Sequence, residues 1–101
     1  MILAVLLWIP CSHSAAQMSV DSSRIVRVLS FNIYHGETMR GDFDLDVIAG
    51  VIRQADPDLV ALQEVDFHTK RARSMDLAGE LGRRTGLLPL FGRAMFFDGG
   101  E

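Results

Sequence analysis

Two apolar runs, each ending near a side chain with a hard oxygen, constrain the fold of this chain more than any other feature. Residues 27–33 contain Asn32, and residues 59–65 contain Glu64. Short apolar runs of this kind predict strands, and the continuous apolar stretch at 59–62 predicts a strand covered on both faces. Two such strands lying side by side would bring an amide and a carboxylate together at one edge of a sheet.

The segment between these runs predicts an amphipathic helix. Asp44 is suited to cap its first turn, and the helix is expected to run to about Gln54. Four apolar residues fall at helical spacing on one side: Leu45, Ile48, Ala49 and Ile52. Pro57 ends the helix, because proline disfavours helical geometry in the residue before it. Strand, helix and strand with short joins predict an α/β layer.

The rest of the chain predicts one more helix and one more strand. Ser74 is suited to cap the helix and Gly86 to stop it. Residues 87–97 predict a third strand, interrupted by Pro89 and Gly92. The order strand-helix-strand-helix-strand leaves one face of the sheet without a partner. We therefore expect an N-terminal fragment of a larger protein, which would not be stable alone.

The first sixteen residues have the pattern of a secretory signal peptide. Residues 2–9 form an uninterrupted apolar run, too short to span a bilayer, which needs about 20 residues. Small residues at 14–16 suit cleavage, although no Lys or Arg precedes the apolar run. The predicted organisation is a signal peptide at 1–16, a flexible lead-in at 17–24 and a domain at 25–101. The protein would then be secreted or periplasmic, without a stable membrane span; the alternative is an apolar N-terminus of a cytoplasmic protein.

Composition excludes few functions. The net charge of −3 shows no basic footprint of the kind typical of nucleic-acid binders. Nucleic acid is still a possible substrate, because a metal site can supply positive charge locally. Cys11 is the single cysteine, so no internal disulfide can form. No glycine-rich phosphate loop, nucleophile elbow or zinc pattern occurs.

Asn32 and Glu64 are the candidate metal ligands and catalytic residues. Mg²⁺ takes few protein ligands, prefers oxygen and keeps most of its waters, so an amide and a carboxylate suit it. We predict Mg²⁺, with Mn²⁺ as the alternative. Asn32 could instead be a polar cap at a strand end, whereas a carboxylate after an apolar strand needs solvent or a partner.

Two further residues are candidates for substrate binding. His35 lies in the loop after the first strand, where it could form a hydrogen bond with a substrate phosphate. Arg71 is preferred among the cations of the loop at 67–73, since Arg suits bidentate contact with oxyanions. The alternative for this loop is a solvated basic surface.

The chain resembles the endonuclease/exonuclease/phosphatase superfamily. The resemblance rests on Ser30-Phe31-Asn32-Ile33 and Leu62-Gln63-Glu64-Val65, together with Asp56-Pro57-Asp58, Val65-Asp66 and the loop at 69–73. It extends from about Arg27 to the end of the chain, roughly a third of such a domain. Asn32-Ile33-Tyr34-His35-Gly36 and Gly99-Gly100-Glu101 resemble a bacterial, often exported, branch.

The resemblance implies a four-layer α/β/β/α sandwich that hydrolyses a phosphate ester with a divalent metal. Glu64 would be the principal Mg²⁺ ligand, and Asn32 would assist directly or through water. The general-base histidine and the remaining ligands of the family belong to later motifs that this chain does not contain, so the fragment alone is expected to be inactive. The substrate could be a small phosphate, a lipid headgroup or, alternatively, DNA or RNA. A non-catalytic binding protein of the same fold is the other alternative.

Overall fold

The computed structural model describes residues 21, 23 and 25–101. The predicted signal peptide and most of the predicted lead-in lie outside the described residues. Within the part that is described, no helix has the length and apolar character needed to cross a membrane.

The centre of the structure is a parallel pair of strands, β1 (Val28–Asn32) and β2 (Leu59–Gln63). Val28 pairs with Leu59 and Asn32 with Gln63, so the two strands end at the same edge. Just before β1, the carbonyl of Arg27 accepts the amides of Asp58 and Leu59 at 2.9 and 3.1 Å. Both strands predicted from the apolar runs are therefore confirmed, each slightly shorter than expected.

Helix α1 (Leu45–Ala55) connects the two strands and confirms the first predicted helix. The Asp44 carboxylate caps it by accepting the amides of Asp46 and Val47 at 2.9 and 3.2 Å. Asp56 then adopts a left-handed conformation with φ 47°, directly before Pro57. Local residues thus determine both ends of this helix.

Helix α2 (Leu77–Thr85) begins later than predicted, and Asp76 caps it in place of Ser74. The Asp76 carboxylate accepts the Gly79 amide at 2.9 Å. Ser74 is held in a left-handed turn (φ 58°), and its amide bonds to the Thr69 carbonyl at 2.8 Å. Because the preceding loop closes on itself at Ser74, the helix can start only after that turn. Gly86 ends the helix with φ 76°, as predicted.

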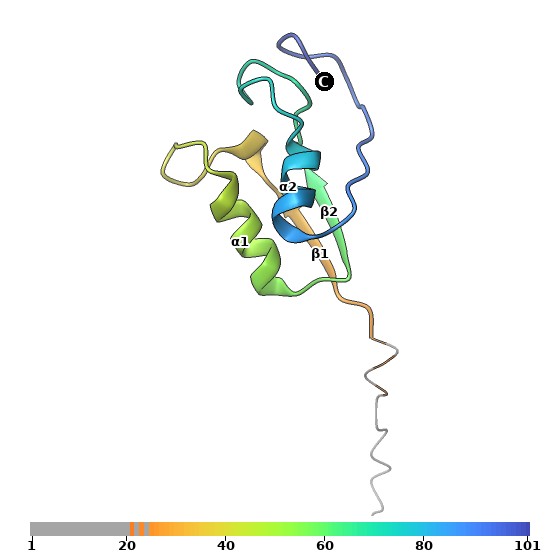
Figure 1. Cartoon of the computed structure of the whole chain (residues 1–101). Helices are drawn as coiled ribbons and strands as arrows, with labels where there is room; N and C mark the ends of the chain where they lie inside the picture. Colours follow the sequence, from red (N-terminus) through yellow and green to blue (C-terminus); the bar gives the residue numbers. More distant parts are fainter. Residues whose placement is uncertain (1–20, 22, 24) are drawn as a thin grey trace, which may run out of the picture.

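Both helices pack on one face of the strand pair (Figure 1). The buried apolar residues come from both helices, from the position after β1 and from the loop before α2: Ile33, Leu45, Ile48, Ala49, Ile52, Ala72, Leu77 and Leu81. Alternate strand residues such as Phe31 and Leu62 pack against this core, whereas Val28 and Leu59 point away and are exposed. This helical layer on a sheet confirms the α/β class and corresponds to the N-terminal part of the predicted sandwich.

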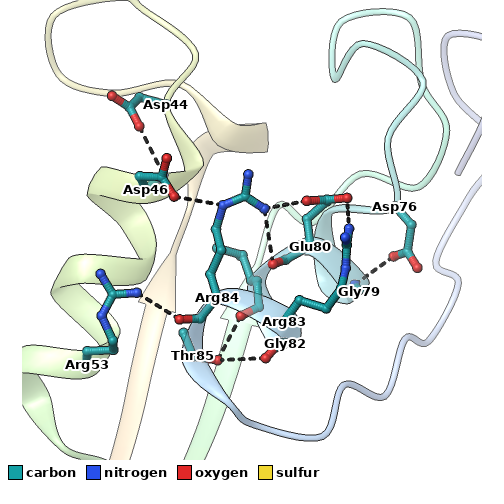
Figure 2. Close-up of polar contacts among 11 residues, drawn as sticks. Asp44, Asp46, Arg53, Asp76, Gly79, Glu80, Gly82, Arg83, Arg84 and Thr85 are labelled. Atoms are coloured by element: carbon teal, nitrogen blue, oxygen red, sulfur yellow. Dashed lines mark hydrogen bonds and ion pairs between the residues drawn. The ribbon is translucent and has the colours of Figure 1, made fainter.

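Polar contacts join the exposed sides of the two helices (Figure 2). Arg84 on α2 donates from Nε to the Asp46 carboxylate on α1 at 2.9 Å and also pairs with Glu80. From the other direction, Arg53 on α1 donates to the Arg84 carbonyl at 2.8 Å. These contacts lie at the rim of the apolar interface, where exposed ion pairs add little free energy but restrict how the helices slide.

The predicted third strand at 87–97 is wrong for this structure. Residues 87–96 run extended without ladder pairing among the described residues, and Leu88 and Leu90 are each 97% exposed. Pro89 lacks an amide donor and Gly92 weakens an extended segment, so this stretch has little intrinsic preference for pairing. A strand forms only against a partner edge, and none pairs with it here.

Residues 97–101 form a tight turn that packs on the loop after β2. Asp98 and Gly99 have φ 48° and 82°, and Phe97 and Gly100 exchange two backbone hydrogen bonds. Phe67 and Glu101 exchange two more, at 2.6 and 2.8 Å. A Cβ atom at Gly100 would lie 2.3 Å from the Phe67 carbonyl oxygen, so only glycine permits this approach.

Candidate active site

Asn32 and Glu64 meet at the carboxyl ends of the two parallel strands. Asn32 is the last residue of β1, and Glu64 directly follows β2. The Asn32 Nδ2 group donates a hydrogen bond to Glu64 Oε1 at 3.0 Å. The Glu64 side chain keeps 46% of its surface exposed. The structure thus brings together the two residues that the sequence predicts as metal ligands, and it leaves the carboxylate accessible.

The orientation of the Asn32 amide is determined by the backbone next to it. Asn32 Oδ1 accepts the Tyr34 amide at 2.9 Å, so the nitrogen of the side chain must face Glu64. A carboxylate that accepts this hydrogen bond is oriented by it. Asn32 therefore has a clear contact through which it could position Glu64, while its oxygen already has a donor.

His35 lies on the opposite side of the Glu64 carboxylate. Its backbone amide donates to the Glu64 carbonyl at 3.0 Å, which joins the loop after β1 to the residue after β2. The imidazole Nδ1 lies 3.9 Å from Glu64 Oε2, and Nε2 lies 3.3 Å from Glu37 Oε2. Only 13% of the His35 side chain is exposed. The predicted loop histidine is therefore a mostly buried neighbour of Glu64, between two carboxylates.

Left-handed backbone conformations are concentrated around this cluster. Tyr34, His35 and Glu64 have φ 45°, 44° and 54°, a region that residues other than glycine rarely adopt. Gly36 follows at φ 93°, and a Cβ atom there would lie 2.5 Å from the Phe43 ring. Each such non-glycine conformation costs about 1 kcal/mol or more, and such residues cluster at functional sites. Here they direct the side chains of His35 and Glu64 toward each other.

Arg71 lies behind the cluster, where it is bound to Asp66. Its Nε and Nη2 groups donate to the two Asp66 carboxylate oxygens at 2.6 and 2.9 Å. Its guanidinium lies 4.5 Å from the centre of the Phe97 ring, a cation–π contact. Its backbone amide donates to the Asp98 carboxylate at 2.8 Å. The two guanidinium N–H groups that could bind a phosphate together are thus occupied by Asp66. Substrate binding by Arg71 stays a prediction.

Asp66 is the buried carboxylate to which Arg71 and Thr69 are bound. Its side chain is 7% exposed and accepts the Thr69 hydroxyl at 2.6 Å in addition to the two Arg71 bonds. Burial acts to raise the pKa of Asp66, but the hydrogen bonds from Arg71 and Thr69 outweigh it and hold the pKa below its usual value. The hydrogen bond to Asp66 in turn raises the pKa of Arg71. The pair is therefore fully ionised at neutral pH.

Sequence reasoning identified neither Asp66, Thr69 and Asp98 as partners of Arg71, nor Glu37 as the partner of His35. The spacing of Asp66, Thr69 and Arg71 within one loop is the signal that could have found the first group, since short polar side chains at such spacing often close a loop. Nothing local pairs Asp98 with residue 71, because that contact spans a long separation in the chain. Glu37 could have been found only by knowing the left-handed turn at His35.

The donor set suits a hard divalent cation that retains several waters. Among the described residues, no three His, Cys, Asp or Glu side chains converge on one point. Glu64 nevertheless offers an accessible carboxylate, and His35 offers a ring nitrogen, Nδ1, that is buried without a hydrogen-bond partner. Mg²⁺ and Mn²⁺ are commonly held by one or two protein groups together with substrate oxygens. The residues present therefore fit such a metal, and Glu64 is the carboxylate that would hold it.

A cavity of about 650 Å³ lies beside the cluster, between β2, α2 and the extended segment after α2. Glu64, Asp66 and Arg71 line one part of it, and apolar side chains such as Leu62 and Phe91 line much of the rest. Asn32 and His35 do not line it, so the cavity and the polar cluster share only Glu64. Asn32 and His35 therefore lie outside this cavity, and Glu64 stands at the boundary between the cavity and the polar cluster.

Comparison with known proteins identifies the family. A search of curated proteins and a search of solved structures each return no match. The family model described as the Endonuclease/Exonuclease/phosphatase family matches residues 29–100, which include all of β1 except its first residue, the whole of β2, both helices and the Asn32–His35–Glu64 cluster. The chain therefore belongs to the endonuclease/exonuclease/phosphatase family of hydrolases, whose enzymes cleave phosphoesters.

Proposed function

We propose that the protein containing this chain hydrolyses a phosphate ester with the help of a bound divalent metal, Mg²⁺ or Mn²⁺, held principally by Glu64. Family membership supports the reaction class. The observation that carries the proposal is the Asn32–Glu64 hydrogen bond of 3.0 Å at the open edge of the sheet, with the carboxylate half-exposed.

The metal, when bound, supplies a Lewis acid that polarises a phosphoryl oxygen and offsets the charge of the leaving group. The chain's own residues prepare the place for it. Glu64 provides the anionic oxygens, and Asn32 holds Oε1 so that the carboxylate keeps one orientation. His35 fixes the other side of the site through its backbone hydrogen bond to the Glu64 carbonyl. Such preorganisation matters because misplaced groups lose much of their effect on the reaction.

The later family motifs are part of this proposal. One carboxylate, one amide and one imidazole lie together at the edge of the sheet, and we assign the metal-binding part of the site to them. Activation of water by a general base is assigned to motifs beyond those in this chain. The full-length protein is therefore the proposed enzyme, and residues 25–101 alone are proposed to be inactive.

The leader pattern supports an exported protein. We assign residues 1–16 to a signal peptide and the mature enzyme to the periplasm or the outside of the cell, as the apolar run and small residues suggest. Divalent metals and phosphate esters are both accessible to an enzyme there. Fractionation of cells that produce the full-length protein, with N-terminal sequencing of the mature form, tests the export and the cleavage after Ala16.

The central experiment assays the full-length protein against a phosphodiester, a phosphomonoester and DNA, with and without EDTA. Hydrolysis of at least one substrate, lost with EDTA and restored by Mg²⁺ or Mn²⁺, is the expected result. Preference for DNA over the small esters would favour the nuclease alternative. Activity that is insensitive to EDTA, or hydrolysis of none of the three by a folded protein, would contradict the proposed function.

A further inference from the structure

We infer that His35 is a nitrogen ligand of the divalent metal, through Nδ1, and that Glu37 is the positioning residue that orients the ring by its contact with Nε2. The inference rests on the proposed function, since it concerns the metal that Glu64 is proposed to hold. It adds a specific ligand and gives the site a reason to prefer Mn²⁺ over Mg²⁺.

The first step concerns the ring orientation. The imidazole is mostly buried, and its two nitrogens lie near two different carboxylates: Nε2 is 3.3 Å from Glu37 Oε2, and Nδ1 is 3.9 Å from Glu64 Oε2. Only the Glu37 distance is short enough for a hydrogen bond. In a neutral imidazole the proton therefore resides on Nε2, which donates to Glu37, and Nδ1 carries the lone pair.

The second step concerns the unpaired nitrogen. Nδ1 of His35 is buried and has no hydrogen-bond partner in the described structure. In that tautomer Nδ1 is an acceptor, as is the Glu64 carboxylate 3.9 Å away, so the two groups cannot form a hydrogen bond with each other. A buried acceptor without a donor is unfavourable, and two facing acceptors are more so. A cation between Nδ1 and Oε2 removes both problems at once.

The third step concerns the arrangement of the surrounding groups. Histidines that bind metals usually donate their second ring N–H to a carboxylate or carbonyl, which fixes the tautomer and makes the bound nitrogen more basic. Glu37 has this relation to His35. The left-handed conformation of His35, at φ 44°, brings the ring into this position. The backbone bond from His35 to the Glu64 carbonyl keeps the two candidate ligands at a constant separation.

A nitrogen ligand changes the metal preference that a carboxylate alone would give. Mg²⁺ strongly prefers oxygen donors, whereas the divalent first-row transition metals, of which Mn²⁺ is one, bind imidazole more readily than Mg²⁺ does. We therefore expect the site to bind Mn²⁺ more tightly than Mg²⁺, with His35 responsible for the difference. Replacing His35 should reduce the affinity for Mn²⁺ more than the affinity for Mg²⁺.

The chain offers a matched control in His68. This histidine also has a left-handed backbone (φ 58°) in a loop after a strand, but it is exposed and its Nδ1 lies 2.8 Å from the Ser74 carbonyl oxygen. His68→Gln should therefore leave metal binding unchanged. Glu37→Gln keeps the imidazole but weakens its outer partner, and should weaken Mn²⁺ binding by about tenfold while the nitrogen stays bound.

The test uses the full-length protein with Mn²⁺ as the probe. Isothermal titration calorimetry measures the affinity, and pulsed electron paramagnetic resonance detects a ¹⁴N nucleus bonded to Mn²⁺. His35→Gln is expected to weaken Mn²⁺ binding about tenfold or more and to remove one ¹⁴N coupling. His68→Gln is expected to keep the wild-type affinity and the ¹⁴N coupling. Unchanged ¹⁴N coupling in His35→Gln, with binding that still depends on Glu64, overturns this inference and leaves the proposed function intact. Mn²⁺ binding that is absent or insensitive to Glu64→Gln overturns the proposed function as well.

A second measurement needs no substitution at His35 and so does not depend on the folding of that variant. Nuclear magnetic resonance of protein labelled with ¹⁵N-histidine is followed during titration with Zn²⁺, a diamagnetic probe. The His35 Nδ1 resonance is expected to shift on binding while Nε2 remains protonated. A His35 ring protonated on both nitrogens that does not respond to a bound metal would mean that a proton occupies this position, and would overturn the inference.

Discussion

Glu64 and Asp66 are two residues apart on the same chain segment, yet their surroundings are opposite. Asp66 is buried, and three donor groups on Arg71 and Thr69 occupy its oxygens. Glu64 is half-exposed, accepts one amide through Oε1 and faces an unpaired nitrogen at Oε2. The comparison separates two uses of a carboxylate: one saturated with hydrogen bonds to close a loop, and one left with capacity for a ligand.

Alternation along an extended chain explains how two neighbouring acids reach such different places. Residues at positions i and i+2 of a regular strand share a face. The left-handed conformation of Glu64, at φ 54°, interrupts that alternation directly after β2. Glu64 therefore points to the rim of the sheet, while Asp66 turns inward to the loop that precedes α2. A single unusual backbone residue assigns one acid to the surface and the other to the interior.

The largest expected effect comes from Glu64→Gln in the full-length protein. Removing the charge of the carboxylate that is proposed to bind the metal should lower kcat/KM by about a thousandfold, or about 4 kcal/mol of transition-state stabilisation. The free energy of unfolding should change little, because the side chain is half-exposed. Steady-state kinetics with added Mg²⁺ and urea unfolding measure the two quantities. Retained activity would remove Glu64 from the mechanism.

Asp66→Asn should lower the stability of the protein and leave its activity largely intact, the reverse of Glu64→Gln. It leaves the Arg71 guanidinium beside a neutral partner, and we expect the free energy of unfolding to fall by about 2 kcal/mol. That value is below the range for fully buried pairs because the Arg71 side chain is 39% exposed. Folded protein should retain most of its activity, which urea unfolding and assays at low temperature can establish together. Loss of activity as large as that of Glu64→Gln, in a folded variant, would contradict the division between the two acids.

Asn32→Ala tests how far activity depends on the orientation of the Glu64 carboxylate within the Asn32–His35–Glu64 cluster. Its amide contributes one hydrogen bond to Glu64 and accepts one from the Tyr34 backbone. We expect kcat/KM to fall by about tenfold, or about 1.4 kcal/mol, because the carboxylate keeps its charge but loses its fixed direction. Asn32→Asp is the informative companion, since it restores an acceptor for Tyr34 but places a second negative charge beside Glu64. An Asn32→Ala enzyme with full activity would show that Glu64 needs no orientation.

The smallest effect concerns acid stability. The pKa of Asp66 is lower in the folded protein than its ordinary value of 3.8, so its ionised form favours folding. This contribution is complete above about pH 3.8 and is lost as the pH falls through the folded pKa. The difference in unfolding free energy between wild type and Asp66→Asn should therefore shrink below pH 3.8. Urea unfolding between pH 3 and pH 7 measures it, and a difference that grows on acidification would contradict the assigned direction of the shift.

Features determined by nearby residues could be predicted from the sequence. Helix α1 has its cap at Asp44 and its stop at Asp56 within its own segment, so both ends follow from short-range chemistry. The two strands follow from apolar runs, and their parallel pairing follows from the helix between them. The meeting of Asn32 and Glu64 follows in turn from that pairing, because parallel strands end at a common edge.

Features that depend on distant contacts could not be predicted. The start of α2 depends on a loop that closes at Ser74. The position of Arg71 depends on its contacts with Asp66 and with residues 97 and 98. The segment at 87–96 has strand-like residues, but a strand is a property of two segments and no second one pairs with it here. The position of His35 depends on a left-handed turn, which propensity alone does not indicate for a residue of this kind.

The close approach of Gly100 to Phe67 has a consequence for how the protein is made. The chain leaves the ribosome in order, so the segment behind Glu64 emerges well before the glycine that covers it. Until residue 101 has emerged, the backbone at Phe67 cannot form its two bonds with Glu101, and Arg71 lacks the Asp98 carboxylate. Asn32 and Glu64 can therefore meet early in synthesis, whereas the loop that follows Glu64 gains its last contacts only after these later residues appear.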